Sequence, residues 1–346
     1  MTPKARTSKR ISRPKEIRCA VIGYGGAFNM GKAHSEWINA ASGLRAVAAC
    51  DLDPKRRAAA RQDFPEFRTY ARVGNLLKDP EVDLCVVITP HNTHARLAVQ
   101  CAQAGKHVVV EKPMCLSAAE ATQMIQAARK AGVTLTVFHN RRHDGDYKAI
   151  KKAIDDGRIG QAFHVEMWGG SYGRPGTWWR SSKRVSGGHF YDWGAHYVDW
   201  LLNVMAPRQV VGVAGRFHKL VWHHVTNEDH VEAWIRFDDG AVADVQFSSI
   251  ACADKPRWRI LGTQGAIVDR WGGQFELTSV VKGVPMRAEV RYQESDWPAY
   301  YQNLANHLLR GQELEVKPEE AARVISIMEA AERSSRSGKV EKVAYP

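Results

Sequence analysis

The chain has 346 residues, 44% of them hydrophobic and 25% charged, which is ordinary for a globular protein and sufficient for two domains. We find no apolar segment long enough to span a bilayer and expect no membrane partner. The net charge of +12 would suit nucleic-acid binding, but residues 1–18 alone carry seven basic side chains against one acidic side chain. Because half of the net charge lies there, we interpret residues 1–15 as a disordered basic tail and expect no nucleic-acid partner.

The cysteines argue against a disulfide-stabilised, secreted protein. There are six of them, without a CxxC pair, and the first three lie in apolar, strand-like runs. We therefore expect buried, reduced thiols and a cytoplasmic location. The cysteines are Cys19, Cys50, Cys85, Cys101, Cys115 and Cys252.

The first part of the chain alternates between short apolar runs and helical stretches. The runs cover residues 17–23, 44–51, 83–89, 106–112 and 133–139, and the helices are expected at 31–40, 54–64, 93–104 and 117–131. Strands that are apolar on both faces and alternate with helices are typical of a parallel sheet covered on both sides. The pattern predicts a doubly wound α/β domain over residues 16–140.

The second part of the chain has a different rhythm. A helix at about 145–156 precedes longer alternating segments, such as 230–237, 241–250, 257–262 and 288–293, separated by glycine-containing turns. Two helices are expected at the end, at about 297–310 and 318–336. Residues 141–346 are thus predicted to form an α+β domain with a large, mostly antiparallel, open-faced sheet, and the C-terminal helix is free to pack back on the first domain.

The segment GYGGAFNMG, residues 23–31, lies between the first strand and the first helix. Glycines at this place let the backbone approach a pyrophosphate, whose charge then meets the helix N-terminus. The usual GxGxxG pattern would place its third glycine at Phe28, and the next glycine is Gly31. The segment predicts a dinucleotide site that includes Gly23, Gly25, Gly26, Ala27 and Phe28.

Asp51 ends the second strand, where a carboxylate can accept hydrogen bonds from both ribose hydroxyls. The alternative is that it caps the helix that starts at Pro54. A carboxylate repels a 2′-phosphate, so NAD is favoured, although Lys55, Arg56 and Arg57 leave NADP open.

The segment TPHNTH, residues 89–94, follows the next apolar run, and strand ends on this side of a parallel sheet form the ligand crevice. Capping of the following helix by Asn92 or Thr93 is an alternative that explains His91 and His94 less well. The cofactor candidates here are Thr89, Pro90, His91, Asn92 and His94.

The segment EKP, residues 111–113, leaves the following strand in the same crevice. A residue before proline favours an extended backbone, which fixes the direction of the Lys112 side chain. Its ammonium group can hydrogen-bond a substrate oxygen and stabilise developing negative charge. Glu111 is therefore a cofactor candidate, and Lys112 is both a cofactor and a catalytic candidate.

The segment GGHFYDWGAHYVDW, residues 187–200, concentrates titratable and aromatic side chains. If it is helical, Asp192, His196 and Asp199 share one face, and the apolar residues on the other faces require burial. Buried carboxylates and imidazoles cost free energy unless they are paired, so this face is a candidate site. A metal held by His189, Asp192 and His196 is the alternative, but the HExxH form is absent and we predict no metal.

Two further groups of residues are harder to place. For WHHVTNEDH, residues 222–230, we expect a partly exposed polar loop, with a substrate contact, a subunit contact or a metal as alternatives. Five tryptophans in residues 168–200 alternate with basic residues, and aromatic faces pack well against sugar rings, but core packing would explain some of them. We expect two to line a pocket. The substrate candidates are Arg141, Tyr172, Trp178 and His189.

Taken together, GYGG with Asp51, TPHNTH, EKP and GGHFYDWGAH closely resemble the Gfo/Idh/MocA oxidoreductases, from about residue 16 to the end of the chain. The resemblance implies that Lys112, Asp192 and His196 surround the reacting carbon. It also implies that Trp179 and Arg180 lie near the nicotinamide, together with Asn140, which directly follows the run 133–139. Homodimers or homotetramers are a further implication, through the open face of the second sheet.

Three functions fit these residues. The first is an NAD(P)-dependent dehydrogenase or reductase for a secondary hydroxyl of a sugar, cyclitol or sugar acid, in which His196 accepts the proton and Lys112 stabilises the alkoxide. In this scheme Asp192 orients the substrate and sets the charge of the imidazole. The second is a redox-neutral, NAD-dependent glycosidase that works by oxidation and elimination. The third is a non-catalytic, nucleotide-sensing regulator, which is disfavoured because Lys112 and His196 are both present.

Overall fold

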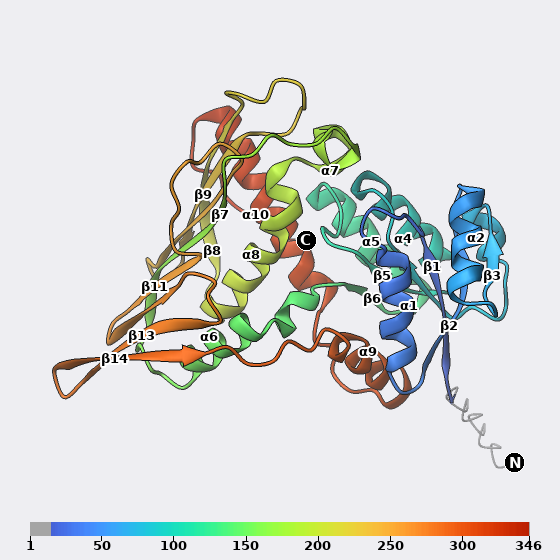
Figure 1. Ribbon diagram of the computed structural model, residues 1–346, viewed down its shortest axis with the longest axis horizontal. Helices are drawn as coiled ribbons and strands as arrows, with labels where there is room; N and C mark the ends of the chain where they lie inside the picture. The colour runs from blue at the N-terminus through green and yellow to red at the C-terminus, as the bar shows by residue number, and fades with distance from the viewer. Residues whose placement is uncertain (1–14, 346) are drawn as a thin grey trace, which may run out of the picture.

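A computed structural model describes residues 15–345, which form two sheets with their helices (Figure 1). The first sheet has six parallel strands in the order β3-β2-β1-β4-β5-β6. Its strands are β1 (Ile17–Ile22), β2 (Leu44–Cys50), β3 (Arg68–Tyr70), β4 (Leu84–Val87), β5 (His107–Val110) and β6 (Leu135–Val137). The predicted basic tail lies, apart from Lys15, outside the described residues.

The first sheet is buried on both faces, as its apolar runs predict. Val21, Val86 and Val109 are fully buried in one core with helices packed around them. These helices are α1 (Met30–Ala40), α2 (Pro54–Asp63), α3 (Val73–Leu76), α4 (His94–Gln103) and α5 (Ala118–Ala131). The helix ends lie within about two residues of the expected positions, whereas the short edge strand β3 had no range assigned to it.

The second sheet has eight strands in the order β14-β13-β12-β11-β7-β10-β9-β8. Neighbouring strands are antiparallel except for the parallel pair β7 and β10. The strands are β7 (Ala162–Gly170), β8 (Val210–His218), β9 (His230–Phe237), β10 (Val242–Ser248), β11 (Trp258–Gly262), β12 (Gly265–Asp269), β13 (Gln274–Val281) and β14 (Val284–Arg291). The result is the predicted combination of an α/β Rossmann unit and an α+β unit with a large, mostly antiparallel sheet.

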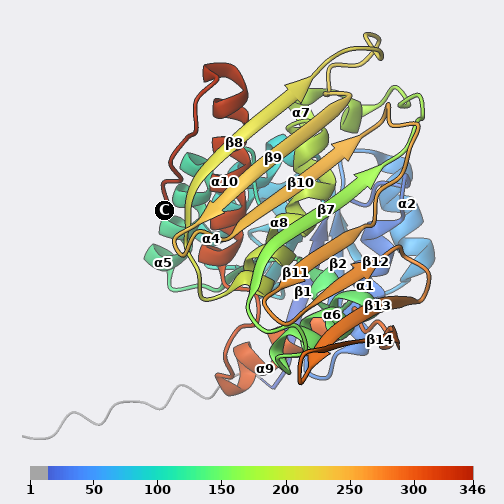
Figure 2. The ribbon, with the colours of Figure 1, turned by 90° about the vertical axis from the view of Figure 1, so that its left-hand side faces the viewer.

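Helices cover one face of the second sheet, and the other face is open (Figure 2). The later helices of the chain are α6 (Gly145–Asp155), α7 (Lys183–Ser186), α8 (His189–Met205), α9 (Ala299–Arg310) and α10 (Pro318–Ser337). Of these, α9 packs in the core of the first sheet through Tyr301 and Leu304. Helix α10 contributes Ala322 and Ile325 to the core of the first sheet and Ile327 and Met328 to the core of the second. It therefore joins the two units: it packs on β8 and beside α8, which packs on β7, β9 and β10.

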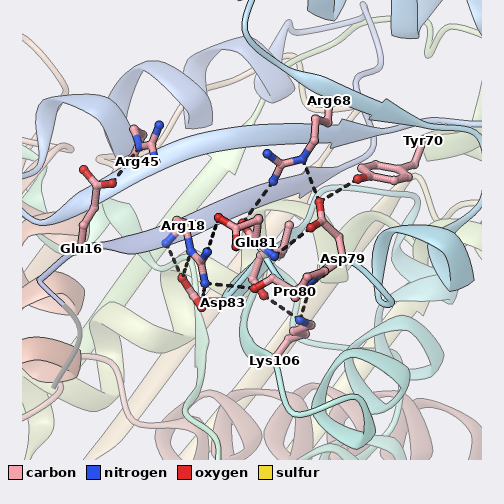
Figure 3. A network of polar contacts seen from close by, with 11 residues as sticks. Glu16, Arg18, Arg45, Arg68, Tyr70, Asp79, Pro80, Glu81, Asp83 and Lys106 are labelled. Carbon is pink, nitrogen blue, oxygen red and sulfur yellow. Dashed lines mark hydrogen bonds and ion pairs between the residues drawn. The ribbon is translucent and has the colours of Figure 1, made fainter. Parts of the chain in front are cut away.

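A charged network lies at the amino ends of β1, β4 and β5, at the opposite edge of the first sheet from the glycine loop (Figure 3). Arg18 donates to both carboxylate oxygens of Asp83, each at 2.8 Å. Lys106 Nζ donates to the main-chain oxygens of Asp79 and Val82 at 2.9 and 2.7 Å. Burial alone would raise the pKa of Asp83, but the hydrogen bonds from Arg18 hold it below its usual value. Arg18 and Lys106 therefore stabilise the amino ends of these strands.

All six cysteines are free thiols, as predicted, but they are not all buried. Cys252 is exposed because it follows β10 in a loop, which corrects the expectation for this residue. Among residues 15–345, no helix is both long and apolar enough to cross a membrane.

Candidate active site

Two adjoining cavities lie at the carboxyl ends of the first sheet's strands. We call them the Asp51 cavity, of about 740 Å³, and the Lys112 cavity, of about 300 Å³. Both are lined by Gly25, Ile88, Thr89 and Trp179, so they form one continuous cleft. Further lining residues of the Asp51 cavity include Gly23, Asp51, Pro90 and Thr93. Further lining residues of the Lys112 cavity include Gly26, Ala27, Phe28, Arg56, His91, His94, Glu111, Lys112, Trp178 and Arg180.

The glycine loop forms the start of this cleft, and Gly31 performs the packing role of the displaced third glycine. A Cβ at Gly31 would lie 2.7 Å from the Tyr24 ring and 3.0 Å from Gly23 O, so only glycine lets α1 pack this closely on β1. Gly26 is covered by the guanidinium of Arg56, which lines the Lys112 cavity. A dinucleotide pyrophosphate in this cleft would meet both the loop amides and a cation.

Asp51 is held with its carboxylate at the Asp51 cavity. Its oxygens accept hydrogen bonds from the main-chain N–H groups of Tyr24, at 2.7 Å, and Asp53, at 2.9 Å. The capping interpretation of Asp51 is wrong, because Asp53 caps α2 by accepting the Lys55 N–H at 2.8 Å. Arg57 donates to Asp51 O at 2.8 Å and so holds the main chain here.

The segment from Thr89 to Thr93 closes the Asp51 cavity on the other side. The Thr93 hydroxyl donates backwards to Pro90 O at 2.7 Å, and α4 has no side-chain cap, which corrects the capping alternative. Asn92 is exposed and lines neither cavity. Thr89 and Pro90 are thus the cofactor candidates that the fold brings to this cavity, and Thr93, considered from the sequence only as a helix cap, also lines it.

The two histidines of this segment are buried, with ring nitrogens bonded to main-chain oxygens. His91 Nδ1 donates to Ser186 O at 2.8 Å, and burial lowers the pKa of His91 to about 3. His94 Nδ1 and Nε2 each lie 2.8 Å from a carbonyl oxygen, of Pro113 and Thr89 respectively. Burial also lowers the pKa of His94, so the neutral ring donates to one of them. His94 thus lines the Lys112 cavity, and its single N–H ties the ring to the main chain.

Lys112 reaches from the end of β5 to helix α8. Its Nζ donates to Asp192 Oδ1 at 2.8 Å and to Asp192 O at 3.0 Å. Arg180 forms a second ion pair with the same Asp192 oxygen. Burial opposes ionisation of Asp192, but Lys112 and Arg180 outweigh it and hold its pKa well below its usual value. Asp192 is therefore a carboxylate that fixes two cations.

His196 lies one turn further along α8 and is 4% exposed. Burial lowers the pKa of His196 well below its ordinary value, and the charge of Lys112 adds to this effect. The ring is therefore neutral and able to accept a proton, and its buried Nδ1 has no partner among the described residues. Asp192 has no hydrogen bond to the imidazole in residues 15–345, so the expectation that it sets the charge of His196 by contact is not met.

Trp178, Trp179 and Arg180 close the Lys112 cavity from the second unit. The Arg180 guanidinium lies 4.9 Å from the Trp179 ring centre and 5.0 Å from the Phe28 ring centre. Phe28 is 58% exposed and belongs to the glycine loop, so Arg180 connects this loop to Asp192. The two tryptophans expected to line a pocket are thus Trp178 and Trp179, while Trp168 and Trp200 are buried in the core.

Arg141 belongs to a second aromatic group beside Lys112. Its guanidinium lies 4.7 Å from the Trp193 ring centre and 5.6 Å from the Trp297 ring centre. Asp144 accepts a hydrogen bond from Arg141 Nη1 at 2.8 Å and another from Trp297 Nε1 at 2.6 Å. Trp297 is not among the candidates from the sequence, because it lies 156 residues beyond Arg141 and carries no motif.

Three other candidates lie away from the cavities. Tyr172 is 56% exposed and packs on Trp222, His189 is turned toward Phe247, and Asn140 is buried without lining either cavity. The metal alternative gains no support, because residues 15–345 contain no group of three or more side chains suited to hold a metal ion.

The fold and the cleft define a dinucleotide-binding oxidoreductase, and comparison with known proteins gives the family. The description "Oxidoreductase family, NAD-binding Rossmann fold" matches residues 17–139, and "GFO/IDH/MocA C-terminal domain" matches residues 147–268. The chain belongs to the Gfo/Idh/MocA family of oxidoreductases. It is an NAD(P)-dependent dehydrogenase or reductase.

Relatives span most of the chain. It is 29% identical over 314 residues to the scyllo-inositol 2-dehydrogenase (NADP(+)) IolW of Bacillus subtilis, covering 80% of this chain and 83% of that protein. It is 29% identical over 255 residues to the myo-inositol 2-dehydrogenase of Thermotoga maritima, covering 72% and 74%. The solved structure of the Bacillus subtilis oxidoreductase yvaA has a TM-score of 0.87 at 25% identity, covering 96% of this chain and 100% of that one.

Proposed function

We propose that this protein transfers a hydride between NAD and a secondary hydroxyl of a sugar, cyclitol or sugar acid. The observation that carries the proposal is Lys112, which lines the cofactor cleft and forms a part-buried ion pair with Asp192, one helical turn from the neutral His196. The names of two inositol dehydrogenases among the relatives support a CH–OH substrate.

The chemistry follows from the charges of these side chains. The nicotinamide, when bound, supplies the hydride acceptor or donor. In the direction of oxidation, the substrate hydroxyl gives its proton to the neutral His196 imidazole. Lys112 donates a hydrogen bond to the same oxygen and stabilises the alkoxide that forms. Asp192 holds Lys112 in place through their ion pair and also pairs with Arg180.

A carbohydrate-like substrate is supported by the side chains next to Lys112. Trp193 lies 6.0 Å from Lys112 Nζ and 4.7 Å from the Arg141 guanidinium, and an indole face suits the C–H face of a sugar or cyclitol ring. Arg141 retains donors that suit hydroxyls or a carboxylate. A relative of known structure, WlbA of Bordetella pertussis, was solved with NADH and the sugar acid nucleotide UDP-GlcNAcA, at 26% identity and a TM-score of 0.80 over 96% of this chain.

We also propose NAD as the preferred cofactor. Two of the three cations that leave NADP possible have other contacts. Arg56 covers Gly26, and Arg57 donates to main-chain oxygens of Asp51 and Leu52. The Asp51 carboxylate thus lies at its cavity without an ion pair from either arginine, and would repel a 2′-phosphate.

The experiment that tests the proposed function follows nicotinamide reduction by the purified protein with NAD. Cyclitols, free sugars, sugar acids and aryl glycosides are supplied in parallel, and release of the aryl group is recorded. NADH formed in proportion to consumed substrate supports the dehydrogenase. Aryl release without net NADH supports the redox-neutral glycosidase, and no turnover on any substrate supports the regulator.

The remaining proposals concern the setting of the protein. Free thiols, five of them buried, support a reducing, cytoplasmic location. The open face of the second sheet, on which Trp234 is 50% exposed, supports a homodimer or homotetramer (Figure 2). Light scattering of the wild type and of Trp234→Glu tests this, and a wild-type monomer would contradict it.

A further inference from the structure

The polar loop at residues 218–230 is built around one buried carboxylate. Asp229 is fully buried and accepts main-chain hydrogen bonds from Leu220, Val221 and Trp222 at 2.7, 2.6 and 3.1 Å. Lys219 Nζ donates to it at 2.8 Å. Burial opposes ionisation, but these donors hold the pKa of Asp229 at about 2. The loop therefore has a fixed shape. Because these donors surround the Asp229 carboxylate, its arrangement does not require a metal ion.

The neighbouring carboxylate, Glu228, reaches from this loop to the start of helix α8. It is 7% exposed, and its Oε2 accepts the His189 N–H at 3.0 Å. Its other oxygen forms an ion pair with Lys183. Helix α8 has Gly188 at its N-cap position and receives no side-chain cap from that residue. Glu228 thus replaces the missing cap, where an anion is favoured by the helix dipole.

The second glycine of the pair before α8 is explained by this contact. Gly188 has a φ of 108°, which favours glycine, and a Cβ there would collide with the Glu228 carboxylate. The same loop holds the segment that closes the cofactor cleft, because Asn227 Nδ2 donates to Arg180 O at 2.7 Å and Thr226 N donates to Ser181 O at 3.1 Å. The loop therefore contacts two chain segments of the site: the segment that carries Arg180, and the start of α8, which carries Asp192 and His196.

We infer that Glu228 is a positioning residue: by capping α8 from the 218–230 loop, it holds Asp192 and His196 in register with Lys112. Asp192 is in the first turn of α8 and His196 in the next, so a shift of the helix start moves both relative to β5. Glu228 lines neither cofactor cavity. We therefore expect removal of the Glu228 side chain to lower the rate of the chemical step and to leave cofactor affinity unchanged. The catalytic part of this inference rests on the proposed function.

The test compares Glu228→Ala and Glu228→Gln with a matched control, Glu332→Gln. Glu332 forms an ion pair with the same Lys183 at 2.9 Å but belongs to α10 and has no contact with the α8 start among its ion pairs. We expect kcat to fall ~10- to 100-fold in Glu228→Ala, since a displacement of about 1 Å can cost ~100-fold. Glu228→Gln keeps an acceptor for the His189 N–H and should recover most of kcat. Glu332→Gln should match the wild type.

Together with kcat, two further readouts separate a positioning role from an effect on general stability. NAD affinity, measured by fluorescence titration, should stay within about twofold in every variant, because the contact lies outside the cleft. Hydrogen exchange at residues 189–192 should be faster in Glu228→Ala only. Wild-type kcat in Glu228→Ala below its melting temperature, or equal losses in the Ala and Gln variants, would overturn the inference. If the wild type turns over no substrate, the proposed function fails, and the inference then stands or falls on the exchange result.

Discussion

Lys112 and Asp192 lie 80 positions apart in the sequence, yet Lys112 Nζ is 2.8 Å from Asp192 Oδ1. Lys112 follows β5 of the first sheet, and Asp192 belongs to α8, which packs on the second sheet. The pair therefore forms only when both units are folded and docked. It places the Lys112 ammonium group at the cofactor cleft, where its charge also acts on His196.

Removal of the Lys112 charge should abolish turnover without loss of cofactor binding. In Lys112→Met, Asp192 keeps its ion pair with Arg180, so the fold is retained, but no ammonium group is left to stabilise an alkoxide. We expect kcat to fall by about 100- to 1000-fold, with NAD affinity nearly unchanged. Lys106→Met, at the opposite end of β5, is the control and should lower stability but not kcat. Normal turnover in Lys112→Met would remove this lysine from the mechanism.

Cofactor preference should depend on Asp51 and not on its neighbour. Asp51→Ser removes the charge that opposes a 2′-phosphate, so the ratio of kcat/KM for NADP to that for NAD should rise by roughly 10-fold or more. Asp53→Ser changes the charge two residues away, at the cap of α2, and should leave this ratio unchanged. Steady-state kinetics with both cofactors measures it. A ratio that moves equally in both variants would point to net charge and away from a specific contact.

His91 should make the protein less stable in acid. Burial lowers the pKa of His91 to about 3, whereas the unfolded chain takes up a proton near pH 6.5. The unfolded state therefore binds more protons below that pH, and the free energy of unfolding falls as the pH drops. From pH 8 to 5, His91 alone should account for about 2 kcal/mol. In His91→Asn, which keeps a donor toward Ser186 O, urea unfolding should show a pH dependence smaller by this amount. An identical pH dependence in both proteins would contradict this assignment.

Arg141 should affect substrate recognition more than cofactor binding. Its guanidinium is held between Trp193 and Trp297 and lines neither cofactor cavity. Arg141→Gln should therefore raise the substrate KM by about 10-fold, most strongly for substrates with a carboxylate, and leave NAD affinity unchanged. If KM for neutral and acidic substrates rises equally, Arg141 acts through packing on the indoles.

The sequence patterns predict the elements well where one local signal decides them. Apolar runs gave the strands of the first sheet, and the glycine loop with Asp51 indicated the nucleotide edge. The capping alternatives fail where near neighbours compete for one role. Asp53, and not Asp51, caps α2, and neither Asn92 nor Thr93 caps α4 with its side chain.

Contacts between distant segments were beyond the sequence patterns. Only the family resemblance groups Lys112 with Asp192 and His196. The spacing of Asp192 and His196 by itself indicates only that they share a face of α8. Trp297 and Glu228 carry no motif, because their roles arise from contact with Arg141 and His189 in the folded chain. Tyr172 and His189 are substrate candidates because of their chemistry; in the folded chain they pack on Trp222 and Phe247 and line neither cavity.

Direct transfer of the hydride is the central claim, and isotope transfer tests it most directly. The purified protein is incubated with NAD and a substrate found active in the panel, deuterated at the carbinol carbon, and the nicotinamide is analysed by mass spectrometry. We predict NADH that carries the deuterium, formed about 100- to 1000-fold more slowly by Lys112→Met. NADH without deuterium, or product formed with no deuterium transfer to the nicotinamide, would contradict the account.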